Sequence, residues 1–276
     1  MMFLVLLGAA LHATWNVIIK AGSDRLLDTV LVACGAASVA MLALPFVPLP
    51  EKGSWPYLCT SIVFNLVYFI LVALTYQTGD LSYAYPIMRG SAPPLTAILA
   101  ALTVGEPLSL GAWSGIALIS GGILMLMGDS WRSGRLHLAT AAFGLLNSLV
   151  IVAYTVVDGI GVRLSGNAWS YTLWLFVLIP LPLLTLVLFT RPRAFLSQLH
   201  ARWKPGFVGG VCTTASYGLA LWAMTFAPIA LVAALRETSV IFGTVFASLF
   251  LHERFGLVRF LAAGAVTLGA VAIKLF

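Results

Sequence analysis

Two charged pairs with the same spacing lie in an otherwise apolar sequence. Arg89 and Glu106 are seventeen residues apart, and so are Arg236 and Glu253, which follow at an offset of 147 residues in a chain of 276. Each arginine lies inside a long apolar stretch, and each glutamate comes just after one. A guanidinium group inside a membrane is costly unless it faces a cavity or a partner, where it can bind an anionic group. The repeated spacing therefore predicts a duplicated chain with buried cation sites.

The composition indicates that these stretches lie in a lipid bilayer. Hydrophobic residues make up 61% of the sequence and charged residues 9%, whereas soluble domains carry about 25% charged residues. The first stretch lacks a charged segment before it and many spans follow, so we expect it to be retained rather than cleaved as a signal peptide. The sequence predicts an all-α integral membrane protein. A helix needs roughly 20 apolar residues to cross the bilayer, and ten stretches qualify, near residues 2–20, 28–48, 56–77, 82–103, 111–128, 137–157, 169–189, 205–226, 229–250 and 257–275.

The ten predicted transmembrane helices divide into two units of five, residues 1–135 and 136–276. Because five is an odd number, the second unit enters the membrane with the opposite orientation. The fold class is therefore predicted to be two inverted five-helix repeats around a central cavity, a plan typical of secondary transporters. The alternative is that the duplication serves only to build a stable helical bundle.

Inversion suggests where the two buried arginines lie. Arg89 and Arg236 would stand at similar depths from opposite faces, and we expect them to contact an anionic group at the two mouths of one pathway. The alternative is that each forms a structural ion pair or extends to its nearer surface. Glu237 and Asp158 are the acidic residues available near Arg236.

Lysine and arginine are distributed unequally over the predicted loops. One side carries only Lys52, Arg163 and Lys274. Positive residues mark the cytoplasmic side, so the count predicts that both termini lie outside. Because these residues are spread over loops, they indicate contact with the lipid bilayer rather than with nucleic acid. The other side carries ten, Lys20, Arg25, Arg132, Arg135, Arg191, Arg193, Arg202, Lys204, Arg254 and Arg259.

Polar and aromatic residues recur at helical spacing within several spans and are predicted to face the bundle interior. Converging aromatic rings with a few polar groups are typical of a small-molecule site. For the aromatic residues the alternatives are packing and a belt at the membrane interface. The predicted substrate-binding residues are His12, Trp15, Asn16, Asn65, Tyr68, Tyr85, Arg89, Asn147, Tyr154, Tyr217, Trp222 and Arg236.

Two further groups of residues suggest coupling and movement. Asp158 and Glu237 are candidates for proton coupling or for ion pairing, and a histidine such as His12 can take a proton near neutral pH. Pro93 and Pro94 are predicted to kink the fourth span and to act as a hinge. The ninth span has no proline at the matching positions.

The fifth and tenth spans are rich in small residues, including Gly111, Gly115 and Gly269. Small residues let helices approach closely. The expected use is packing within one chain, which would leave a monomer; the alternative is a homodimer contact through these two spans.

The sequence contains no pattern for common enzymatic chemistry. We find no phosphate-binding glycine loop and no zinc-binding or hydrolase motif, and the three cysteines, Cys34, Cys59 and Cys212, are scattered. We therefore expect neither an enzyme, nor a cofactor, nor a metal site.

Three segments carry a resemblance to a known family. LHATWNVIIKAG in the first span, GEPLSLGAWSGIALISGGILML at the end of the first unit and LHERFGLVRFLAAGAVTLGAVAI at the end of the second resemble the drug/metabolite transporter superfamily, EamA type. The resemblance covers nearly the whole chain. It implies ten helices, a cavity formed by spans 1, 3, 4, 6, 8 and 9, a scaffold of spans 5 and 10, and a place in the inner cell membrane. Better-known relatives are drawn with cytoplasmic termini, the opposite of the charge count.

These observations together predict a secondary transporter that moves a small organic metabolite by alternating access. The resemblance implies export of amino acids or related amphiphilic metabolites. The alternative within transport is import or exchange of an anionic metabolite, favoured by the positive cavity. The alternative of another class is a non-transporting scaffold or complex subunit.

Overall fold

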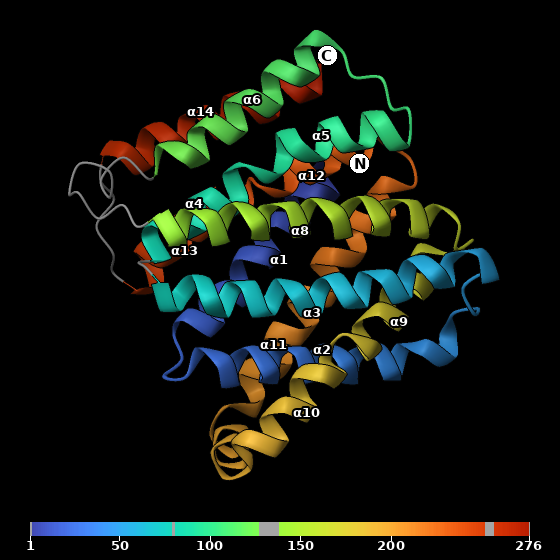
Figure 1. Ribbon diagram of the computed structural model, residues 1–276, viewed down its shortest axis with the longest axis vertical. Coiled ribbons are helices and arrows are strands. Elements are labelled where there is room, and N and C mark those ends of the chain that lie inside the picture. Colours follow the sequence, from blue (N-terminus) through green and yellow to red (C-terminus); the bar gives the residue numbers. More distant parts are fainter. Residues whose placement is uncertain (1, 79–80, 127–137, 252–256, 276) are drawn as a thin grey trace.

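The computed structural model describes residues 2–78, 81–126, 138–251 and 257–275, and within these ranges all regular secondary structure is helical (Figure 1). The α-helices are α1 (Met2–Lys20), α2 (Arg25–Ala43), α3 (Trp55–Thr78), α4 (Leu81–Gly90), α5 (Ala92–Thr103), α6 (Leu110–Met125), α8 (Leu138–Arg163), α9 (Ala168–Leu178), α10 (Pro180–Thr190), α11 (Pro192–Met224), α12 (Ile229–Arg236), α13 (Ser239–Leu251) and α14 (Leu257–Leu275). Two short 3₁₀ turns, Leu44–Phe46 and Lys52–Ser54, flank the α2–α3 connection.

Within the described ranges, seven segments are long and apolar enough to cross a membrane, and α6 is a shorter apolar helix. The predictions of an all-helical fold and of a multi-pass membrane protein are thereby confirmed. The seven segments are Met2–Lys20, Arg25–Phe46, Lys52–Val72, Leu138–Arg163, Ala168–Thr190, Pro192–Met224 and Leu257–Leu275.

Breaks within the predicted spans have local causes. The fourth span is divided at Ser91, and Pro93 follows in the first turn of α5. Proline is tolerated there because backbone amides in the first turn of a helix have no carbonyl acceptor within the helix, so the loss of one costs little. The seventh span is divided at Pro180, which begins α10. In α11 the backbone leaves the helical region at Arg202, three residues before Pro205, because proline removes an amide donor and clashes with the preceding turn.

The ninth span is divided between α12 and α13 without a proline. The amides of Glu237 and Thr238 bond to carbonyl oxygens three residues back, and the Thr238 hydroxyl donates to the Leu235 carbonyl at 2.6 Å. Threonine hydroxyls compete with the backbone for such carbonyls, which weakens a helix locally. Both spans that carry the repeated arginines are therefore broken, although the sequence predicted a kink only in the fourth.

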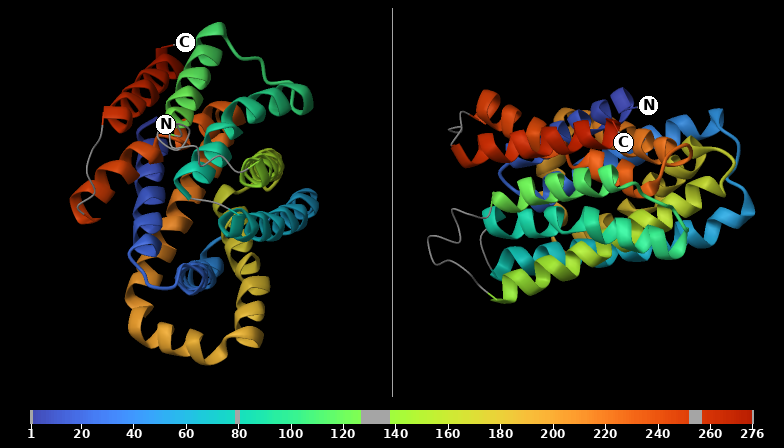
Figure 2. Two further views of the ribbon diagram at one scale, coloured as in Figure 1. Left: turned by 60° about the vertical axis from the view of Figure 1, so that its left-hand side comes forward. Right: turned by 90° about the horizontal axis from the view of Figure 1, so that it is seen from above.

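Small residues bring two helix pairs into close contact. A Cβ atom added to Gly115 on α6 would lie 2.7 Å from the carbonyl oxygen of Gly269 on α14, and one added to Gly35 on α2 would lie 2.5 Å from that of Gly206 on α11. Helices α6 and α14 lie side by side at one edge of the bundle (Figures 1 and 2). Their small-residue faces thus pack against each other within one chain, while the homodimer stays a prediction.

The two ends of the bundle differ in charge. Helices α1, α10 and α11 bring Lys20, Arg191 and Arg202 to one end, together with the beginning of α2. Both termini lie at the other end (Figures 1 and 2). Most of the described basic residues outside the bundle interior are therefore gathered at the end opposite the termini, as the loop count predicted.

Candidate functional site

A narrow cavity lies where α4, α5, α8 and α12 meet. In this conformation it has room for about one water molecule. Ala92, Pro93, Ile151 and Ala233 complete its wall. Its polar lining consists of Arg89, Thr96, Tyr154, Thr155, Arg236 and Glu237.

Both repeated arginines line this one cavity, so the expectation that they stand at opposite mouths is wrong. Arg89 is at the end of α4, and Arg236 is at the end of α12. Each helix is the first half of a divided span, and the arginine in its last turn therefore lies near the middle of that span. The helix breaks, which the spacing alone does not reveal, bring the two guanidinium groups together.

Arg89 forms an ion pair with Glu237, with a nitrogen–oxygen distance of 2.8 Å. Only 9% of the Arg89 side chain and 7% of the Glu237 side chain are exposed. The pair joins the first half of the chain to the second. Glu237 was predicted as a possible partner of Arg236, its neighbour in sequence; instead it binds the arginine of the other half. The other carboxylate oxygen of Glu237, Oε2, is buried without a hydrogen-bond partner in the described part of the chain.

Arg236 contacts an aromatic ring. Its guanidinium carbon lies 4.7 Å from the centre of the Tyr217 ring, the geometry of a cation–π interaction. Among the residues that the structure describes, no carboxylate forms an ion pair with Arg236. Asp158, the other predicted partner, is linked to Arg236 indirectly, because it binds the hydroxyl of the same tyrosine.

Asp158 is fully buried on α8 and is held by hydroxyl groups. Tyr217 on α11 donates to its Oδ2 atom at 2.5 Å, and Tyr171 on α9 donates to its Oδ1 atom at 2.8 Å. Ser61 on α3 donates a third hydrogen bond to this carboxyl group, and Asn65 donates to the Ser61 oxygen at 3.3 Å. The polar residues of four helices thus meet at one carboxyl group. Tyr171 and Ser61 were not singled out in the sequence, although Ser61 lies one helical turn before Asn65 on the same face.

Helix α1, which carries His12, Trp15 and Asn16, packs against α11, α12 and α13. The rings of His12 and Trp15 meet edge to face, with centroids 5.0 Å apart. Asn16 donates to the His12 carbonyl at 2.8 Å, a bond within its own helix. The indole nitrogen of Trp15 is buried without a partner among the described residues. These residues do not line the cavity in this conformation.

Of the remaining predicted substrate-binding residues, some lie at or beside the cavity and others do not. Tyr154 lines the cavity, and Tyr68 packs against its ring at 6.2 Å between centroids. Asn147 is buried and donates to the sulfur of Met88 at 2.9 Å. Trp222 packs on Phe226 near the end of α11. The side chain of Tyr85 lies outside the described residues.

Sequence reasoning missed Thr96 and Thr155 in the cavity wall. The Thr96 hydroxyl donates to the Ala92 carbonyl of its own helix at 2.9 Å. Because this bond within the helix satisfies the hydroxyl group, threonine can occur in any apolar helix. The sequence therefore carries no signal that separates these two threonines from others.

Glu106 joins the two halves near the ends of α5 and α8. Its Oε1 atom accepts from Arg163 at 2.6 Å, and its Oε2 atom accepts from the backbone amide of Ile229 at 2.8 Å. Ile229 begins α12, so Glu106 caps a helix of the second half, where a negative charge is favoured. Arg163 also donates to the carbonyl oxygens of Met224 and Ala227. Glu106 therefore both caps α12 and pairs with Arg163; Glu253 lies outside the described residues.

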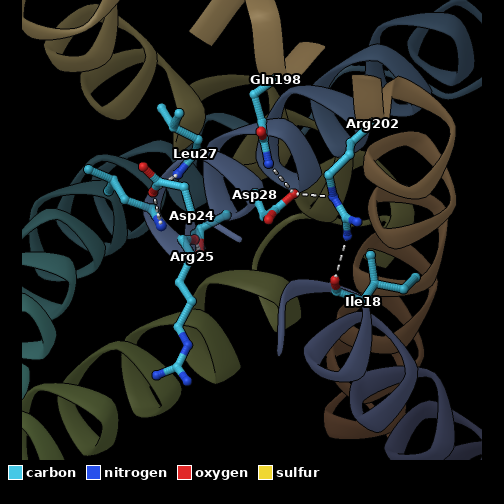
Figure 3. A network of polar contacts seen from close by, with 9 residues as sticks. Ile18, Asp24, Arg25, Leu27, Asp28, Gln198 and Arg202 are labelled. Atoms are coloured by element: carbon cyan, nitrogen blue, oxygen red, sulfur yellow. Dashed lines mark hydrogen bonds and ion pairs between the residues drawn. The ribbon is translucent and has the colours of Figure 1, made fainter. Parts of the chain in front are cut away.

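A second network of polar contacts links helices at the end of the bundle that carries Lys20, Arg191 and Arg202 (Figure 3). Asp28 accepts from Arg202 at 2.8 Å and from Gln198 at 3.1 Å, while Arg202 also donates to the Ile18 carbonyl. Asp24 caps the start of α2. The cavity thus lies between two ends that are each fastened by an ion pair.

Comparisons with known proteins agree with this architecture. The model of the EamA-like transporter family matches residues 1–128 and 138–275. An uncharacterized protein, y4nH, of Sinorhizobium fredii (strain NBRC 101917 / NGR234) is 29% identical over 109 residues, which are 40% of this chain and 90% of that protein. A solved structure described only as "Crystal structure of protein" superposes with a TM-score of 0.78 at 15% identity, over 99% of this chain and 95% of the other. At that identity the structural likeness shows the fold alone.

Proposed function

Because the chain belongs to the EamA-like transporter family, whose members are transporters rather than enzymes, we propose that it is a secondary transporter of small organic metabolites. In this proposal it works by alternating access in the inner cell membrane. The observation that carries the proposal is a buried, charged cavity at the meeting point of helices from both halves. A scaffold protein has no need of such a cavity, because buried charges cost free energy.

We also propose that ten spans form two inverted units. Each predicted span falls on one helix or on two helices separated by a break, and the family model matches the two halves separately. We propose that both termini lie outside, since most of the described loop lysines and arginines lie at the opposite end. Labelling single cysteines added beside Lys52 and beside Arg193 with an impermeant maleimide tests this. Labelling only beside Lys52 in intact cells supports it; labelling only beside Arg193 contradicts it.

The cavity favours a substrate that has both a carboxylate and a hydrogen-bond donor. Arg236 has no carboxylate partner within the described ranges, so it can take an anionic group by a charge-assisted hydrogen bond. The unpartnered Glu237 Oε2 atom can accept from an ammonium group. Tyr154 supplies an aromatic wall. Amino acids and related amphiphilic metabolites meet these requirements, and the family resemblance favours their export.

The second candidate is import or exchange of an anionic metabolite without an ammonium group. Two guanidinium groups and one carboxylate line the cavity, so their charges sum to a positive value. A single carboxylate on Arg236 would balance that charge.

Transport by purified protein in lipid vesicles tests the proposal. Uptake and efflux of radiolabelled leucine, phenylalanine, lactate and succinate would be compared between vesicles with and without the protein. We expect transport of at least one compound, and its loss in Arg236→Ala but not in the exposed control Arg193→Ala. Movement of leucine or phenylalanine supports the first candidate, and movement of lactate or succinate alone supports the second. Vesicles that move none of the four, or equal activity in Arg236→Ala, would contradict the proposal.

A further inference from the structure

Asp158 differs from the other buried acidic residues in the kind of partner it has. Asp28 and Glu237 each bind an arginine. Asp158 is 0% exposed and binds the hydroxyl groups of Tyr171, Tyr217 and Ser61. Among the described residues, no cation lies within ion-pair distance of it. Its negative charge is therefore hydrogen-bonded but not neutralised by direct contact.

Hydroxyl partners suit both protonation states of a carboxyl group, whereas a guanidinium partner favours the ionised state. A guanidinium group is positively charged and only donates, so it favours a carboxylate that accepts at both oxygens. A hydroxyl group both donates and accepts. The same three hydroxyls can donate to an ionised Asp158, or one can turn and accept from a protonated Asp158. This site therefore keeps its hydrogen bonds when a proton is added.

Tyr217 connects this carboxyl group to the cavity. Its hydroxyl binds Asp158, and its ring lies under the guanidinium group of Arg236, which lines the cavity. The charge on Arg236 favours the ionised form of Asp158 across that ring. A carboxylate bound to Arg236 would neutralise this charge and so favour a proton on Asp158.

We propose that Asp158 is a proton-binding site coupled to the substrate site through Tyr217 and Arg236. The inference rests on the proposed transport function and adds the coupling ion to it. The proton comes from water on one side of the membrane, forms an O–H bond with Asp158 and leaves to water on the other side. Coupling is reciprocal, so a proton on Asp158 strengthens carboxylate binding at Arg236. The proton and the carboxylate consequently travel in the same direction.

The neighbours of Asp158 define which groups belong to this coupled set. Cys59 and Ser61 are on α3, and Tyr171 is on α9. Tyr217 and Arg236 come from α11 and α12. Of these neighbours only Arg236 carries a fixed charge, so the substrate that neutralises it has the largest effect on the proton.

Infrared spectroscopy of the full-length protein in lipid tests proton binding without a substrate. On acidification, we expect the C=O band of a protonated carboxyl group to appear in the wild type and to be lost in Asp158→Asn. The matched controls Asp28→Asn and Glu237→Gln should keep the band. A folded Asp158→Asn protein that shows the same band would overturn the inference. If Asp158→Asn does not fold, Tyr217→Phe serves as the test. The carboxyl band should then appear at higher pH than in the wild type, because ionised Asp158 has lost the hydrogen bond that Tyr217 donates. A titration of the band that is unchanged in Tyr217→Phe would overturn the proposal.

Transport in the same vesicles tests the coupling. For the compound that the wild type moves, a pH gradient should drive its accumulation, and Asp158→Asn should reduce this accumulation at least about tenfold while counterflow without a gradient stays within about twofold. Gradient-driven accumulation by Asp158→Asn at the wild-type level would overturn the inference. If the wild type moves no compound, the transport proposal fails, and the infrared band alone decides whether Asp158 binds a proton.

Discussion

Arg89 and Arg236 stand at equivalent positions of the two repeats, yet their surroundings differ. Both lie in the last turn of the first half of a divided span, and both line the same cavity. Arg89 is held by Glu237, whereas Arg236 lies on the ring of Tyr217. The duplicated architecture thus brings two cations to one cavity, where neighbouring residues give each cation a different partner.

The residue after each arginine accounts for much of this difference. Gly90 follows Arg89, and Glu237 follows Arg236. A Cβ atom added to Gly90 would lie 2.9 Å from the side chain of Leu124 on α6, so a larger residue here requires Leu124 to shift. The second repeat has a carboxylate there, and this carboxylate neutralises the arginine of the first repeat. Arg236 is left without a carboxylate partner among the described residues, which is why we propose it as the substrate contact.

The largest effect is expected from breaking the Arg89–Glu237 pair. Glu237→Ala leaves Arg89 as a buried charge, and removing one partner of a buried ion pair lowers the free energy of unfolding by about 3–5 kcal/mol. Replacing both partners, as in Arg89→Met with Glu237→Leu, should recover most of this loss. Unfolding in detergent, followed by circular dichroism, measures both variants. A single variant as stable as the wild type would show that the pair does not hold the two halves together.

A smaller effect is expected from adding a side chain beside Arg89. Gly90→Ala places a methyl group against Leu124 and should cost about 1–3 kcal/mol of unfolding free energy, as overpacking does in other cores. The matched control is Gly121→Ala on α6, where an added Cβ atom meets nothing within 4 Å. Equal stability of the two variants would refute the steric reason for the glycine at position 90.

Arg236 should affect transport more than stability. Arg236→Ala removes a cation–π contact worth about 0.5–2 kcal/mol but leaves no carboxylate ion pair broken. Transport should fall about tenfold or more, equivalent to about 1.4 kcal/mol of lost substrate binding. Arg236→Lys, which keeps the charge but not the planar fork, should lie between Ala and wild type. If Arg236→Ala destabilises as much as Glu237→Ala, the division of tasks between the two arginines is refuted.

The smallest effect is expected at the cap of α12. Glu106→Gln keeps a hydrogen-bond acceptor for the Ile229 amide but loses the charge that pairs with Arg163, and should cost about 1 kcal/mol of unfolding free energy. Glu51→Gln, an exposed carboxylate at the same end, serves as the control. Because α12 carries Arg236, transport should also fall slightly. A loss no larger than that of Glu51→Gln would show that the cap is dispensable.

Sequence reasoning reached the elements more reliably than the contacts between them. Apolar length placed the spans, because the bilayer imposes a fixed thickness on every one of them. The cost of a buried charge correctly directed attention to Arg89 and Arg236. The break between α12 and α13 was missed, because Thr238 has no distinctive signal in a sequence. The residues that bind Asp158 were missed in part for the same reason: hydroxyl groups are common in apolar helices, and only the packing of α3, α9 and α11 selects Ser61, Tyr171 and Tyr217.

By itself, the sequence determined that this chain is an all-helical membrane protein with a duplicated cation inside it. The preference of apolar residues for the bilayer and the free-energy cost of burying a charge depend on the residue type alone, so both can be predicted from the sequence. Only the tertiary structure decided that the two arginines share one cavity, that Glu237 neutralises Arg89, and that Asp158 is joined to Arg236 through Tyr217. These contacts connect helices from distant parts of the chain, and which side chains meet depends on how the helices break and pack.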